Sequence, residues 1–508
     1  MRQSMKPSYT LAVPDAAPNI NLATKAKQVE TWLAGLPNDD ALAKCDLLAA
    51  YLAEHDRPDL PASFRKELLA LTGQAVAEAL YSLKAEFKAL PLPMDGRQRD
   101  RVDRLIGLLL TVAALYQRLI LDHVEYPPRR FGDHLLPGLV SGLLRVSGRI
   151  LDICYLCHRQ PPDGLWRDIH QTGYLIFNAH LNDVLDPAGS GATLIEIYTA
   201  LLLEAAADPY HCTERTRLWI EDAIDRQGCL AQVEYADSAT HKGIYGIRVD
   251  EDKPPYPLSW RMEITPACEL VLNTAPLARK LALVINQMEQ GRAMEQAVPA
   301  AWFQPYKALL QQLKLLWSGA MARSAPRRTS SWPARQRATL GFTAIHAQLV
   351  GGLNGGAEAG AIGFELVNES PGGIAISVDK PAFRLQVGML ILLGQGQGNR
   401  PHGLGLVRWF KTRTDGVSML GIKLLFGQPR SVTVFPSDGR HVYPGLLLQP
   451  GNGLPENKAA PSRLILPAIR MEVDTRVDVR EDTARVRLLL TERLEGSNDI
   501  ALFRCRAD

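Results

Sequence analysis

The stretch AIGFELVNESPGGIAISVD, residues 361–379, decides the fold of the C-terminal half. Apolar residues alternate with other residues on both sides of the turn NESPGG. Residues two apart in a strand lie on one face of a sheet, so this pattern predicts a β-hairpin with one apolar face. The alternating apolar residues are Ile362, Phe364, Leu366, Ile374, Ile376 and Val378.

Further short alternating runs with Gly, Pro and Asn turns surround this hairpin. They favour a closed antiparallel β-barrel over residues 339–437. Beyond the loop GNGLPENKAAPS, residues 451–462, apolar and polar residues alternate again. We therefore expect a short C-terminal β unit over residues 438–508, which is either a second small sheet or additional strands packed on the barrel.

The N-terminal half has a different pattern, with apolar residues at helical spacing. A helix start is indicated by Thr193 and Glu196, which stand at capping-box spacing. The expected fold class is multidomain α+β, with an all-α domain that carries a small β insertion. The segments expected before the barrel are a flexible N-terminus (1–20), a helical domain (21–228), a small β segment (229–275), helices (276–321) and an Arg-rich linker (322–338).

The composition is that of a globular protein, with 46% hydrophobic and 22% charged residues and a net charge of only +3. So small a net charge provides no overall attraction to DNA, RNA or an anionic membrane. The polar N-terminus has no signal-peptide pattern, and the seven scattered cysteines fit a reducing compartment. We expect a cytoplasmic protein without membrane insertion.

The linker concentrates positive charge. Its sequence RSAPRRTSSWPARQR, residues 323–337, contains five arginines and no acidic residue. The planar guanidinium of arginine pairs bidentately with phosphate oxygens and with the O6 and N7 edge of guanine. A local anion site is therefore one interpretation of this segment, and a solvated spacer is the plain one.

Two short motifs in this order resemble the PilZ family, whose small β-barrels bind the bacterial second messenger cyclic di-GMP. They are R-x-x-x-R at Arg323 and Arg327, and N-x-S-x-x-G at Asn368, Ser370 and Gly373. The strands VGMLILL and GLGLVRW follow, then GVSMLGIKLLF. The resemblance covers residues 323–435. The helical half, with LWRDIH and LLLEAAADPY, is similar to the region upstream of the barrel in some large proteobacterial PilZ proteins.

The resemblance implies a ligand site on the linker and the turn. Its arginines would hold phosphate and guanine, its tryptophan would stack on a base, and its turn would hold a guanine edge beside glycines that permit close approach. The expected ligand-binding residues are Arg323, Arg327, Arg328, Trp332, Asn368, Ser370, Gly372 and Gly373.

The register of the arginine motif has an alternative. If the motif begins at Arg327 or Arg328, then Ser331 or Trp332 occupies the place of its second arginine, and the site is degenerate. The first register predicts a cyclic di-GMP receptor that couples ligand binding to rearrangement of the helical domain and to a protein partner there. In the second register, either Arg335 and Arg337 substitute for the missing arginine or the ligand is lost. A barrel that has lost the ligand would be an interaction scaffold that binds no nucleotide.

The sequence gives no indication of an enzyme, a metal site or a cofactor other than this ligand. It has no H-E-x-x-H or G-x-S-x-G motif, and no catalytic residues are predicted. The segment CYLCH, residues 154–158, has the spacing of a haem attachment site but continues an apolar helix face, which favours a structural role. Trp409 alternates with apolar strand positions, so we expect it in the barrel core.

Overall fold

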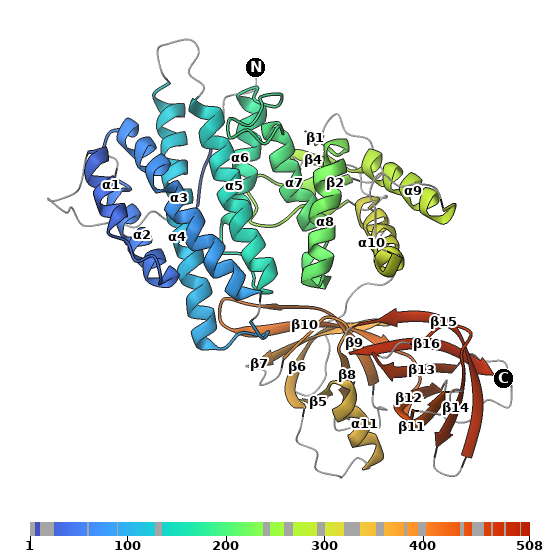
Figure 1. The fold of residues 1–508 in the computed structure, drawn as a ribbon. Coiled ribbons are helices and arrows are strands. Elements are labelled where there is room, and N and C mark those ends of the chain that lie inside the picture. The colour runs from blue at the N-terminus through green and yellow to red at the C-terminus, as the bar shows by residue number, and fades with distance from the viewer. Residues whose placement is uncertain are drawn as a thin grey trace. The chain divides into compact units, whose positions relative to one another are not determined.

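The computed structural model divides into two compact units, Met1–Leu90 with Met94–Ala322 and Pro91–Pro93 with Arg323–Asp508 (Figure 1). The residues that the structure describes are 6–10, 25–57, 60–88, 90–127, 135–236, 244–258, 268–291, 300–319, 336–351, 360–379, 384–394, 403–436, 441–449, 462–468, 471–481, 484–497 and 499–508.

The first unit is mostly helical. Side chains that satisfy free backbone amides fix several helix starts. Asp95 and Gln98 form a capping box at α4, and the predicted box of Thr193 and Glu196 at α7 is confirmed. The helices are α1 (Ala26–Ala34), α2 (Ala41–His55), α3 (Ala62–Phe87), α4 (Gly96–Glu125), α5 (Leu135–Leu156), α6 (Leu165–Asn178), α7 (Leu194–Ala206), α8 (Glu214–Gln227), α9 (Ala275–Glu289) and α10 (Ala300–Trp317).

Helix α4 is the one helix in the described part of the chain that is long and apolar enough to cross a membrane. Within this unit, 61% of its most apolar window is buried. A buried core helix passes the same test of length and composition, so the pattern is weak evidence for a membrane span.

A small antiparallel sheet follows α8, within the predicted β segment. Its strands lie in the order β1-β4-β2-β3. They are β1 (Gln232–Tyr235), β2 (Ile244–Ile247), β3 (Tyr256–Pro257) and β4 (Leu270–Asn273).

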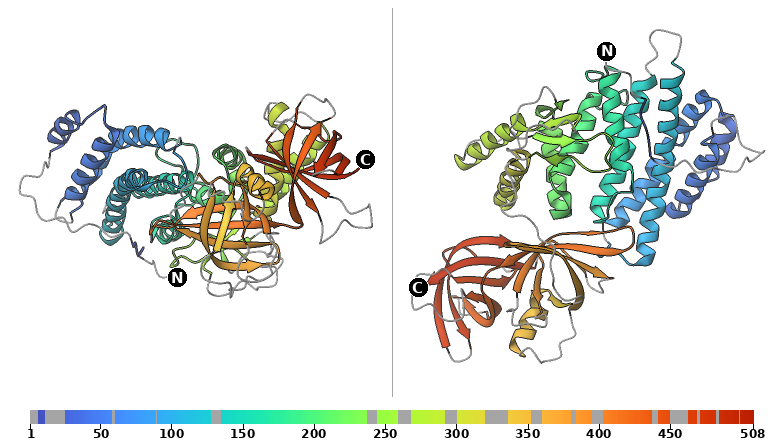
Figure 2. Two further views of the ribbon diagram at one scale, coloured as in Figure 1. Left: turned by 90° about the horizontal axis from the view of Figure 1, so that it is seen from below. Right: turned by 180° about the vertical axis from the view of Figure 1, so that it is seen from behind.

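The second unit contains two closed six-stranded antiparallel barrels, drawn in orange and red (Figures 1 and 2). The first barrel has the order β10-β7-β6-β5-β8-β9 and carries helix α11 (Phe342–Val350). Its strands are β5 (Gln336–Leu340), β6 (Ala361–Ser370), β7 (Gly373–Asp379), β8 (Leu390–Leu393), β9 (Gly403–Thr412) and β10 (Val417–Leu425).

The second barrel has the order β11-β12-β13-β16-β15-β14. When the strands of each barrel are numbered along the chain, both barrels have the same pairing: the first strand pairs with the second and fourth, the third with the second and sixth, and the fifth with the fourth and sixth. The strands are β11 (Gln428–Pro436), β12 (Tyr443–Gln449), β13 (Ser462–Pro467), β14 (Arg476–Glu481), β15 (Ala484–Gly496) and β16 (Ile500–Ala507).

The expected fold class, a helical region with a small sheet followed by antiparallel β structure, is confirmed. The expected C-terminal β unit is a complete second barrel, which takes in strand β11 from the range assigned to the first. Only Phe426 and Gly427 separate β11 from β10, a link as short as a hairpin turn, yet β11 pairs with β12 and β14. Strand β5 begins at Gln336, within the segment expected as linker.

One apolar cluster joins the two barrels. It combines α11 and strands β8, β9 and β10 of the first barrel with strands β12, β13 and β16 of the second. Leu404 and Leu406 face it from the first barrel, and Leu446 and Leu502 from the second. Each barrel also has its own interior core, with Phe364 in the first and Phe503 in the second.

Replacing the fully buried Phe503 tests whether the second barrel has a packed core of its own. We expect Phe503→Ala to lower the free energy of opening of strands β13–β16 by about 3–5 kcal/mol, because it leaves a cavity. Hydrogen exchange of the full-length protein measures this quantity. The matched control is Phe426→Ala, whose side chain is 68% exposed. We expect it to change the same quantity by less than about 0.5 kcal/mol. Equal effects of the two changes would contradict a closed second core.

Candidate functional site

The structure describes one of the two predicted parts of the ligand site. Arg323, Arg327, Arg328 and Trp332 lie outside the described residues. Asn368, Ser370, Gly372 and Gly373 lie in the hairpin formed by β6 and β7. The described part of the candidate site therefore lies on this hairpin and the strands beside it.

The hairpin has a tight turn and a bulge. Ser370 pairs with Gly373, so Pro371 and Gly372 form a two-residue turn. The register shifts between Leu366 and Asn368, which leaves Val367 as the extra residue of β6. Beyond the bulge, Asn368 pairs with Ala375.

The Ser370 side chain is hydrogen-bonded within the turn. The Ser370 hydroxyl donates a hydrogen bond to the carbonyl oxygen of Gly373 at 3.0 Å, so its remaining capacity toward a ligand is as an acceptor. The Asn368 side chain is half-buried and makes no hydrogen bond with any residue that the structure describes. Its amide can donate to and accept from a ligand at the same time.

Position 373 requires a glycine because its backbone lies very close to the backbone of strand β10. Its backbone φ is not in the left-handed region, but a Cβ at this position would lie 2.5 Å from the carbonyl oxygen of Ile422. The Leu424 amide also donates to the Gly372 carbonyl oxygen at 3.1 Å. These contacts fix the hairpin against β10. Around Gly372 itself, a Cβ would meet nothing within 4 Å.

The register places four residues in one row on the outer face of the first barrel. Asn368 pairs with Ala375, Ala375 with Gly421, and Gly421 with Trp409. Directly paired residues of antiparallel strands share a face. Their neighbours Ile374, Ile376, Leu420, Ile422 and Phe410 point into the barrel core. We call Asn368, Ala375, Gly421 and Trp409 the outer row.

Trp409 is therefore not a core residue, and that expectation was wrong. A bulge between β9 and β10 leaves Arg408 as an extra residue, so Val407 and Phe410 enter the core while Trp409 faces outward. The indole lies over Gly421, where a Cβ would be only 1.9 Å from its Nε1 atom. A Trp opposite a Gly is the signal for this arrangement, but the bulge hides their pairing from sequence reasoning.

Cations border the outer row. Lys423 pairs with Gly373 on the outer face, two residues along β10 from Gly421. Arg408 directly precedes Trp409, and Lys411 follows it on β9. Ala375 and Gly421 are buried, so the row offers a ligand the half-buried indole and the half-buried amide. These two groups, bordered by cations, suit a planar ligand that carries negative charge.

No group of three or more His, Cys, Asp or Glu side chains that could hold a metal occurs in the described part of the chain. Cys154 and Cys157 of the CYLCH segment are buried in the helical unit. Burial raises the pKa of the Cys157 thiol to about 12, which keeps it protonated.

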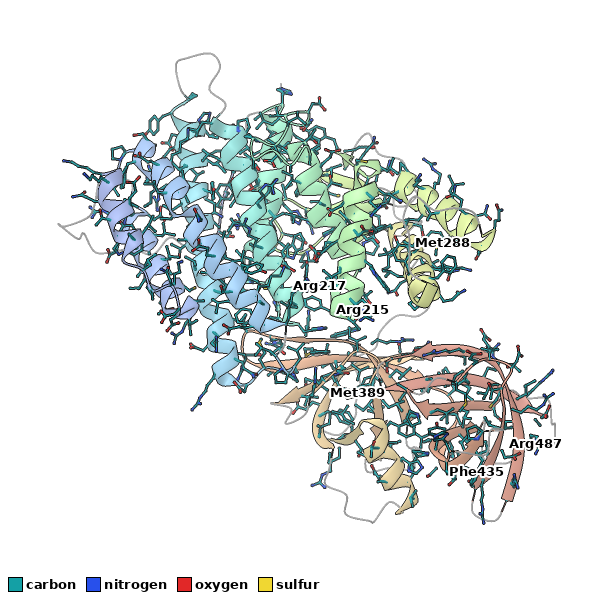
Figure 3. All side chains as sticks on the ribbon, viewed as in Figure 1. Arg215, Arg217, Met288, Met389, Phe435 and Arg487 are labelled. Atoms are coloured by element: carbon teal, nitrogen blue, oxygen red, sulfur yellow. The ribbon has the colours of Figure 1, made fainter. Side chains whose placement is uncertain are left out.

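The helical unit has a charged groove of its own, a cavity of about 770 Å³ lined by α5, α7 and α8. Arg149 and Asp225 are among the residues that line it. Burial raises the pKa of the Glu204 carboxyl at this groove to about 7, although the charge of nearby Arg217 opposes the shift. Arg217, labelled in Figure 3, extends from α8 and pairs with Asp152. The groove can hold a charged segment of another molecule.

Comparison with known proteins places both halves of this chain beside one kind of protein. Residues 27–238 match the family model "Cyclic-di-GMP receptor FimW, N-terminal domain". Cyclic-di-GMP receptor FimW of Pseudomonas aeruginosa is 22% identical over an alignment that covers 99% of this chain and 94% of that protein. No solved structure matches the chain.

The two turn glycines give a matched test of the hairpin geometry. Because a Cβ at Gly373 would collide with the β10 backbone, we expect Gly373→Ala to destabilise the barrel unit by about 1–3 kcal/mol. Gly372→Ala should change its stability by less than about 0.5 kcal/mol. Calorimetric melting of the full-length variants measures both. Equal melting of the two variants would show that the close approach to Ile422 does not exist.

Proposed function

We propose that this chain is a cyclic di-GMP receptor whose ligand binds on the outer row of the first barrel. The observation that carries the proposal is the row itself, which aligns Asn368 and Trp409 across Ala375 and Gly421. The similarity to a cyclic-di-GMP receptor along nearly the whole chain supports it. The resemblance of Asn368, Ser370 and Gly373 to the turn motif of the PilZ family also supports it.

The chemistry of the ligand fits these groups. Cyclic di-GMP carries two guanines and two phosphates. The Asn368 amide can pair with a guanine edge, and the Trp409 indole provides a face on which a base can stack. Ala375 and Gly421 between them are buried, and Gly421 lies beneath the indole, so the ligand would meet the indole and the amide rather than the strand backbones. The linker arginines then pair with phosphate oxygens or with the second guanine.

The length and direction of the chain allow the linker to take part. Strand β5 runs antiparallel to β6 and begins with Gln336 opposite Phe364, so the first residue of β5 points back toward the end of β6 that carries Asn368. Gln336 follows Arg327 by nine positions, a separation of at most about 32 Å. Ser370 follows Phe364 by six positions on β6, or about 20 Å. The arginines can therefore reach the turn.

The output of the receptor is proposed to lie in the helical unit. Ligand would order the arginine segment and change the preferred state of the protein, which a partner protein reads at the helical unit. The charged groove of α5, α7 and α8 offers a surface there for a charged partner segment. We place this signalling in the cytoplasm and assign the chain no enzymatic activity, in line with the receptor name of its relative.

Calorimetric titration of cyclic di-GMP into the full-length protein tests the receptor function. We expect Arg327→Ala to weaken binding at least about tenfold, because a hydrogen bond to a charged group contributes about 1.5–3 kcal/mol. Asn368→Ala should weaken it about two- to tenfold, because a hydrogen bond to the neutral guanine edge contributes about 0.5–1.5 kcal/mol. Arg413→Ala should leave binding unchanged, because Arg413 lies in the β9–β10 turn and pairs with Asp415 at 2.9 Å.

The same titration decides between the two registers of the arginine motif. Weaker binding of cyclic di-GMP by both Arg323→Ala and Arg327→Ala supports the first register. Weaker binding by Arg327→Ala with unchanged binding by Arg323→Ala supports the second. Folded protein that binds no cyclic di-GMP would contradict the receptor function and favour the scaffold.

A further inference from the structure

A carboxylate from the second barrel contacts two cations of the first. Glu495 lies on β15, and its side chain is only 19% exposed. Its Oε1 atom accepts a hydrogen bond from Lys423 Nζ at 2.7 Å and another from Arg408 Nη2. One carboxylate oxygen therefore serves two positive charges. The apolar cluster that joins the barrels supports this arrangement.

Both cations belong to the border of the outer row. Lys423 pairs with Gly373 of the hairpin turn, and Arg408 is the bulged residue next to Trp409. Outer-face positions along a strand are about 7 Å apart, so Lys423 lies one step from Gly421 in the row. The second barrel thus supplies a negative charge at the edge of the proposed ligand site.

The charges at this edge do not balance. Glu495 provides one negative charge against the two positive charges of Arg408 and Lys423. The nearby acidic residue of the same strand, Glu492, pairs with Arg504 instead, at 2.7 Å. The side chains of Arg408 and Lys423 are 36% and 49% exposed, so both remain accessible to a dissolved anion. Solvent screens ion pairs made by cations this exposed, so a dissolved anion can compete for them.

We propose that Arg408 and Lys423 form a subsite for one phosphate group of the ligand, and that Glu495 competes with that phosphate for both cations. This inference rests on the proposed function. A phosphodiester offers a full negative charge and two oxygens, so it can bind the guanidinium bidentately where Glu495 uses a single oxygen. The second barrel thereby sets the ligand concentration at which the first barrel responds.

The test is calorimetric titration of cyclic di-GMP into full-length variants. Glu495→Gln removes the competing charge and keeps the shape of the side chain, so we expect binding about five- to tenfold tighter than in the unmodified protein. Lys423→Ala should weaken binding about three- to tenfold. Glu492→Gln is the matched control on the same strand, and its affinity should equal that of the unmodified protein.

Glu495→Gln in a background that lacks both cations separates competition for the cations from a change in packing. If Glu495 acts through the two cations, most of the gain from Glu495→Gln disappears when Arg408 and Lys423 are both replaced by Ala. A gain that persists in this background overturns the competition.

The outcomes distinguish this inference from the proposed function. If the unmodified protein binds cyclic di-GMP and Glu495→Gln binds it no more tightly, the subsite is overturned and the receptor function stands. Binding by Glu495→Gln alone supports the subsite and contradicts a receptor function of the unmodified chain. Absence of binding in both folded proteins overturns both.

Discussion

The close approach of Gly373 to the carbonyl oxygen of Ile422 is the constraint on which the candidate site depends. It lets β7 and β10 pair right up to the hairpin turn, where Gly373 lies opposite Lys423. The register that follows aligns Ala375 with Gly421 and so continues the row from Asn368 to Trp409. A slip of one residue in this pairing would exchange the inner and outer faces, so the four residues of the outer row would no longer lie side by side.

The two barrels share one strand connectivity but differ in the chemistry of their outer faces. The outer row of the first has small residues beside an indole. On the second, arginines and carboxylates pair across strands. Asp478 of β14, for example, accepts hydrogen bonds from Arg487 and Arg485 of β15, and these lower the pKa of its carboxyl to about 2. Arg487 is labelled in Figure 3. In our account the second barrel modulates the site through Glu495 and need not bind the ligand itself.

Local signals predicted much of this structure. The capping box of Thr193 and Glu196 needs only neighbouring residues, and so does the hairpin around NESPGG, because alternation and turn residues mark it. Helix α11 was missed because nine residues are too few for a clear helical period beside strands. The closure of the second barrel was missed because it depends on pairing between distant strands, as between β11 and β14.

The candidate site shows the same division between local and long-range information. Sequence reasoning found Asn368 and Ser370 through their turn, but it placed Trp409 in the core because the bulge at Arg408 is set by the partner strand. Glu495 had no local signal at all, since its contacts with Lys423 and Arg408 join two barrels.

The central claim is that cyclic di-GMP binds on the outer row, and fluorine NMR tests it most directly. The full-length protein would be labelled with 5-fluorotryptophan at its eight tryptophans, with Trp409 assigned through Trp409→Phe. We predict that saturating cyclic di-GMP shifts the Trp409 resonance because a base stacks at the indole. A bound ligand that leaves this resonance in place would contradict the account and move the site away from the outer row.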